Sequence, residues 1–73
     1  MILPTKHLAP GESLLGVAAL LLRELQTPRS VNELWENVRE IPGLGTFDRY
    51  TLALDLLFIM GLATFRRGRL TLA

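Results

Sequence analysis

The stretch LATFRRGRLTL, residues 62–72, decides the fold predicted for this chain. Two short runs in which apolar and polar residues alternate, residues 64–66 and 69–71, flank the pair Arg67-Gly68. Glycine tolerates the positive φ that a tight two-residue turn requires. The stretch therefore predicts a C-terminal β-hairpin with arginines around its tip. Such a hairpin belongs either to a DNA-binding domain or to a protein-binding domain with a charged edge.

Residues 13–25, SLLGVAALLLREL, predict the first of three helices that precede the hairpin. Ser13 is a suitable N-cap, because its side-chain oxygen can accept a hydrogen bond from the first turn. The apolar residues cover more than one face, which is typical of a helix that is buried on more than one side. Two interpretations stay open: the helix is the centre of the core, or part of it belongs to an interface.

Residues 30–41 predict a second, shorter helix. Ser30 and Glu33 have the spacing of a capping box. An apolar stripe with helical spacing follows and includes Trp35, which we expect to be largely buried between helices. The outer face is acidic, with Arg39 as its cation; it carries Asn32, Glu33, Glu36, Asn37 and Glu40.

Residues 46–61, TFDRYTLALDLLFIMG, predict the third helix, with Thr46 as N-cap and Gly61 just past its end. The expected core face consists of Phe47, Tyr50, Leu54, Leu57 and Phe58. The opposite strip consists of Asp48, Leu52, Asp55 and Ile59. A chain this short cannot bury both faces, so we expect this strip to be a protein interface with an apolar centre and a polar rim. The alternative is that residues 2–8 fold back and cover it.

Three helices followed by a hairpin predict a mainly α, α+β fold of the winged helix-turn-helix type. We expect one domain over residues 1–73, with an extended N-terminal lead at about residues 1–10, where Pro4 and Pro10 disfavour helix. The longest apolar run, residues 14–22, is shorter than the roughly 18–20 residues of a membrane-spanning helix. The first residues also lack the pattern of a signal peptide, which predicts a cytoplasmic protein without membrane contact.

The residue composition argues against an enzyme. The chain has no Cys and one His, His7, so the sequence predicts no disulfide, no metal site and no cofactor. Asp48 and Asp55 are interpreted as a first-turn charge and a solvated residue rather than as a catalytic pair. Apolar residues make up 49% of the chain and mean hydropathy is +0.32. A domain this small leaves part of that apolar surface exposed, which favours binding to a partner.

The charge pattern argues against sequence-specific DNA binding. Eight Lys and Arg against seven Asp and Glu leave a net charge of +1. A helix that reads the major groove needs side chains that donate to base edges, whereas the outer strip of the third helix carries two aspartates and two aliphatic residues. Arg66, Arg67 and Arg69 are predicted to make at most weak, non-specific contacts to phosphates. A small DNA-binding winged-helix transcriptional regulator is the alternative to a protein-binding module.

Four phrases of the sequence, ILPTKHL, SLLGVAALLL, SVNELWENVRE and GTFDRYTLALDLLFIMG, resemble one known family. This is the type 6 middle component of bacterial three-component ABC-ATPase (ABC-3C) systems. The resemblance implies a winged-helix protein encoded beside a coiled-coil ABC ATPase of the SMC/Rad50 kind and a further component, in a system viewed as anti-phage defence. It implies a non-catalytic adaptor or regulatory subunit without cofactors, whose partners are those components. Homo-oligomerisation stays open, and the resemblance does not indicate the binding surface.

Overall fold

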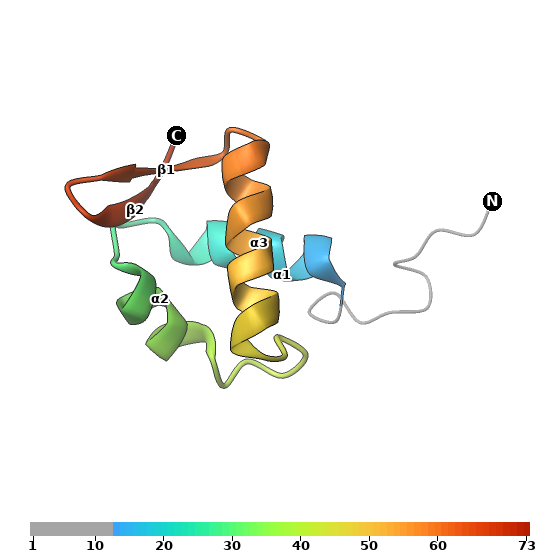
Figure 1. Ribbon diagram of the computed structural model, residues 1–73. Helices are drawn as coiled ribbons and strands as arrows, with labels where there is room; N and C mark the ends of the chain where they lie inside the picture. Colours follow the sequence, from blue (N-terminus) through green and yellow to red (C-terminus); the bar gives the residue numbers. More distant parts are fainter. Residues whose placement is uncertain (1–12) are drawn as a thin grey trace.

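The computed structural model describes residues 13–73. Along the chain it contains α1 (Leu14–Glu24), α2 (Val31–Val38), α3 (Phe47–Ile59), β1 (Ala63–Arg66) and β2 (Arg69–Leu72) (Figure 1). The prediction of three helices followed by a C-terminal hairpin is confirmed, and the arrangement is compatible with a winged helix. The predicted lead at about residues 1–10, including His7, lies outside the described residues.

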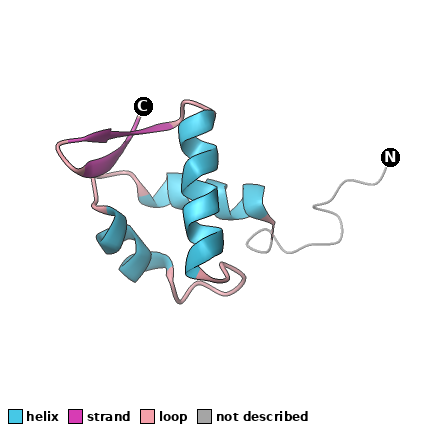
Figure 2. Cartoon of the chain, viewed as in Figure 1, coloured by secondary structure: helices cyan, strands magenta, loops and turns pink. Residues whose placement is uncertain are grey.

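The core forms where α3 crosses α1. Val17, Leu21 and Leu25 are fully buried and belong to the same cluster as Tyr50 and Leu57 of α3. α1 is therefore a central helix of the core, which was one of the two interpretations. Its first turn nevertheless leaves Leu14 and Leu15 exposed. Figure 2 shows the hairpin and α2 on one side of α3 and the N-terminal end of α1 on the other.

The starts of the helices are capped as the sequence predicts. The Ser30 backbone N–H donates to the Glu33 carboxylate at 2.8 Å, and the Glu33 N–H donates to the Ser30 hydroxyl oxygen at 3.1 Å. The hydrogen bond from the Ser30 backbone lowers the pKa of Glu33, because it stabilises the ionised carboxylate. The Thr46 hydroxyl oxygen in turn accepts from the Arg49 N–H at 3.3 Å.

The end of α3 turns the chain into the hairpin. The Leu62 N–H donates to the Leu57 carbonyl at 2.9 Å, and the Gly61 N–H donates to the Phe58 carbonyl at 3.0 Å. These two hydrogen bonds form a Schellman motif, which requires a left-handed residue just past the helix. Gly61 supplies it with φ +71°, as predicted.

The hairpin has a two-residue turn at Arg67-Gly68, and both residues have positive φ, 54° and 77°. This is the turn geometry whose twist matches that of antiparallel strands. The sequence did not predict a further pairing: Arg29 forms a bridge with Leu70, with N–H to carbonyl distances of 3.1 and 2.6 Å. The segment between α1 and α2 is thereby attached to the outer edge of β2.

One prediction about the aromatic residues was wrong: Phe47, assigned to the core face of α3, is 44% exposed. Trp35, expected to be largely buried, packs against the core, with its ring 5.1 Å from that of buried Tyr50. Phe47 lies at the first turn of α3 and packs on the Trp35 ring at 5.1 Å. The core instead includes Ala53 and Leu44, the latter within a segment that the sequence indicated only as a turn.

Candidate protein-binding surface

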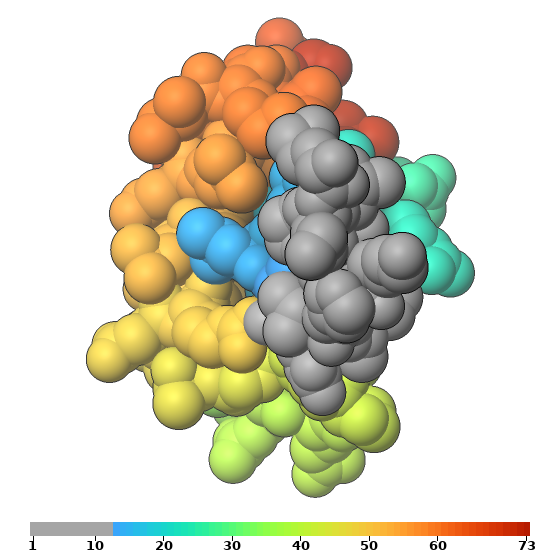
Figure 3. Space-filling view, turned by 90° about the vertical axis from the view of Figure 1, so that its right-hand side faces the viewer, coloured from blue at the N-terminus to red at the C-terminus, as the bar shows by residue number. Residues whose placement is uncertain are grey.

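The strip on α3 that faces away from the core is exposed. Leu52 is 53% exposed and Ile59 is 82% exposed, which is high for large aliphatic side chains in a folded helix. Asp48 and Asp55 on the same strip are exposed as well. In Figure 3 the atoms of α3, yellow to orange, form one side of the view. All four residues of the outer strip are therefore exposed, as expected from the sequence.

The outer face of α2 is exposed and acidic. Asn32, Glu33, Glu36, Asn37 and Glu40 all lie on the surface. Arg39 makes an ion pair with Glu36 at 3.5 Å and also lies over the Trp35 ring, 5.9 Å from its centroid. Carboxylates in this position repel phosphates, so α2 and the outer strip of α3 are both unsuited to lie against a nucleic-acid backbone.

The hairpin carries the positive charge. Arg66, Arg67 and Arg69 are exposed and, with Pro28 and Thr71, line a shallow hollow on the surface. Arg69 also lies near Glu33, whose pKa is lowered mainly by the Ser30 hydrogen bond and further by the positive charge of Arg69. Arg66 and Arg67 lie at the tip of the hairpin, one just before the turn and the other within it.

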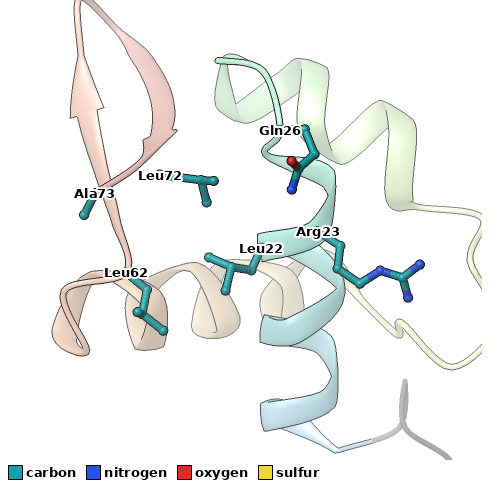
Figure 4. A pocket seen from close by; sticks show the side chains of 6 residues that line it. All are labelled: Leu22, Arg23, Gln26, Leu62, Leu72 and Ala73. Carbon is teal, nitrogen blue, oxygen red and sulfur yellow. The ribbon is translucent and has the colours of Figure 1, made fainter.

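A second, apolar hollow lies between α1 and the base of the hairpin (Figure 4). Leu22 of α1 points toward Leu72 of β2 and Leu62 of the turn after α3, and both of these leucines are partly exposed. Arg23, Gln26 and Ala73 complete the lining. The residues of this hollow come from three separate segments of the chain, so residue spacing in the sequence does not indicate it.

The exposed apolar surface is extensive for so small a protein. It includes Leu14, Leu15, Phe47, Leu52, Ile59, Met60, Leu62, Phe65 and Leu72. Within residues 13–73, no group of His, Cys, Asp and Glu side chains is placed to hold a metal ion. None of the helices described is long and apolar enough to cross a membrane.

These features define a small α+β protein, compatible with a winged helix, whose outer helices present apolar and acidic surface and whose hairpin presents arginines. The chain belongs to the family described as ABC-three component (ABC-3C) system Middle Component 6, whose model matches residues 3–72. The suspected resemblance is thus confirmed. The family is not a known catalytic family, and its name assigns the chain to a multi-component ABC system. No curated protein and no solved structure matches the chain.

Proposed function

We propose that this protein is a non-catalytic adaptor or regulatory subunit of a three-component ABC-ATPase system, and that it acts by binding a partner protein. The family supports the system context. The observation that carries the mode of action is the outer strip of α3, where Leu52 and Ile59 are exposed beside Asp48 and Asp55. An apolar centre within a polar rim is the usual anatomy of a protein interface.

The partner proposed for this strip is the coiled-coil ABC ATPase of the SMC/Rad50 kind that such systems encode, together with the further component. The ATPase carries the nucleotide chemistry, and the middle component couples it to the rest of the system in the cytoplasm, in anti-phage defence. Direct reading of DNA is disfavoured as the main role, because the surface that would enter the major groove carries Asp48 and Asp55 and no described side chain of the outer strip can donate to base edges.

The test is co-purification of the tagged protein with the ATPase and the third component, expressed from the neighbouring genes. The double variant Leu52→Asp with Ile59→Lys replaces two exposed side chains, so its melting temperature should stay close to that of the wild type. The same variant should no longer retain the ATPase, because it introduces charges into the apolar centre.

Leu15→Asp is the matched control, since Leu15 is 59% exposed but lies on α1. It should co-purify like the wild type. If Leu15→Asp loses the ATPase while the α3 double variant retains it, the interface lies on α1 and the proposal for α3 is wrong. If the double variant is strongly destabilised, the α3 strip is covered within the chain.

A further inference from the structure

The free edge of the hairpin is β1. Within residues 13–73, β2 is paired on both sides, with β1 on one side and Arg29 on the other, whereas β1 is paired only with β2. In Figure 1, β1 accordingly lies at the outer rim of the hairpin. An unpaired strand edge presents backbone donors and acceptors to any extended chain that lies beside it.

The register identifies the groups that are available. In a hairpin with a two-residue turn, Arg66 and Arg69 form a hydrogen-bonded pair, so Phe65 and Leu70 form a non-hydrogen-bonded pair. Leu70 confirms this pattern, because its N–H and carbonyl point away from β1 and bond to Arg29. The N–H and carbonyl groups of Phe65, which is 49% exposed, therefore point to the opposite, free edge. Ala63, two residues earlier, points the same way but is buried, so Phe65 supplies the accessible groups.

The two faces of the hairpin beside this edge differ in chemistry. Phe65 shares one face with Ala63; it is 49% exposed and stacks on Phe58 of α3 at 5.3 Å. The other face carries Thr64 and Arg66, and Arg67 follows at the turn. A strand added to β1 would thus place alternate side chains against an aromatic surface and against arginines.

We propose that the β1 edge binds an extended segment of a partner protein in which apolar and acidic side chains alternate. The backbone of the segment would pair with Phe65, its apolar side chains would pack on Phe65 and Phe58, and its carboxylates would reach Arg66 and Arg67. Strand addition of this kind draws affinity from main-chain hydrogen bonds and specificity from alternate side chains. Charge complementarity to the two arginines selects an acidic segment rather than a basic one.

The probe is a short blocked peptide of alternating glutamate and valine, titrated into the full-length protein and followed by amide NMR. The largest shift is expected at the amide of Phe65. A peptide with lysine in place of glutamate should bind at least about tenfold more weakly. No binding of the glutamate peptide, or equal binding of the lysine peptide, overturns the proposal.

Two variants at one position test the backbone pairing. Phe65→Pro removes the outward N–H but leaves the hydrogen bonds between β1 and β2, so it should abolish binding. Phe65→Ala loses the same ring and keeps the N–H, so it should retain measurable binding. Equal binding by the two variants contradicts strand addition. Circular dichroism establishes that both are folded.

If Phe65→Pro fails to fold, variants of the hairpin arginines test the proposal instead. Arg66→Glu with Arg67→Glu should weaken the glutamate peptide by at least about tenfold. Arg23→Glu with Arg39→Glu has the same net charge on other elements and should bind like the wild type. If both double variants lose the same affinity for the glutamate peptide, net charge alone explains the effect and the proposal is overturned.

Two other occupants of the edge have distinct signatures. A second copy of this chain would appear as a dimer in size-exclusion chromatography that Phe65→Pro dissociates. Nucleic acid would bind Arg66 and Arg67 with no dependence on the residue at position 65. Either result overturns the proposal. Because β1 and the α3 strip are separate surfaces, failure here leaves the co-purification result with Leu52 and Ile59 unaffected, and the converse also holds.

Discussion

Tyr50 links α3 to α2, and replacing it with phenylalanine isolates one hydrogen bond. The side chain is fully buried, and its hydroxyl donates to the Val31 carbonyl at 2.6 Å, across 19 residues of sequence. Tyr50→Phe keeps the ring, which packs on Trp35 and Phe47 at 5.1 and 5.6 Å. The variant therefore loses the hydrogen bond without opening a large cavity.

A typical intramolecular hydrogen bond contributes about 0.5–1.5 kcal/mol to stability. We expect Tyr50→Phe to lower the free energy of unfolding by about 1 kcal/mol, at the middle of that range. In a domain of this size such a loss lowers the melting temperature by roughly 4–8 °C. Urea denaturation followed by far-UV circular dichroism is the suitable assay, because the fluorescence of Trp35 changes directly when its neighbour Tyr50 is altered.

Thr51→Ala is the control, since it removes a neighbouring hydroxyl whose hydrogen bond to the Asp48 carbonyl, at 2.9 Å, stays within α3 and is exposed. We expect its stability to lie within about 0.5 kcal/mol of the wild type. If Tyr50→Phe is as stable as the wild type, the Tyr50 hydroxyl does not hold α2 against α3. If both variants lose the same amount, the effect belongs to hydroxyl groups on this helix in general.

Three further predictions concern the aromatic cluster, alkaline pH and DNA. Trp35→Ala should cost roughly 3–5 kcal/mol in urea denaturation, the range typical of a large aromatic residue, because Trp35 packs against the core and against the Tyr50 ring; an unchanged stability would contradict this packing. Burial raises the pKa of Tyr50 to about 12, so its absorbance at alkaline pH should change near that value. The stability contributed by the neutral phenol is complete below the unfolded pKa of about 10 and is lost as pH rises toward 12; titration near pH 10 in the folded protein would contradict this burial. Fluorescence anisotropy with a random duplex at about 150 mM salt should give a Kd no tighter than roughly 10⁻⁴–10⁻⁶ M, whereas nanomolar binding to one sequence would favour the regulator alternative.

The local structure of this protein follows from the sequence alone. The Ser30–Glu33 capping box, the N-cap at Thr46 and the left-handed residue Gly61 all lie where the sequence predicts them. Each depends on hydrogen bonds or φ angles within a few residues, and such interactions are encoded by residue type and spacing. For the same reason, the periodicity of α3 correctly assigned Leu52 and Ile59 to its outer face.

The tertiary structure decided what depends on pairing and packing between distant segments. Three features arise from how α1, α2 and the hairpin pack against α3. They are the bridge of Arg29 to Leu70, the burial of Leu44 and the partial exposure of Trp35 and Phe47. Helical periodicity indicates which face of a helix is apolar but not how far a neighbouring helix covers it, because coverage depends on helix length and crossing position. The sequence could not predict the free edge of β1 for the same reason. Only the pairing of β2 with Arg29 shows which strand of the hairpin has an unpaired edge.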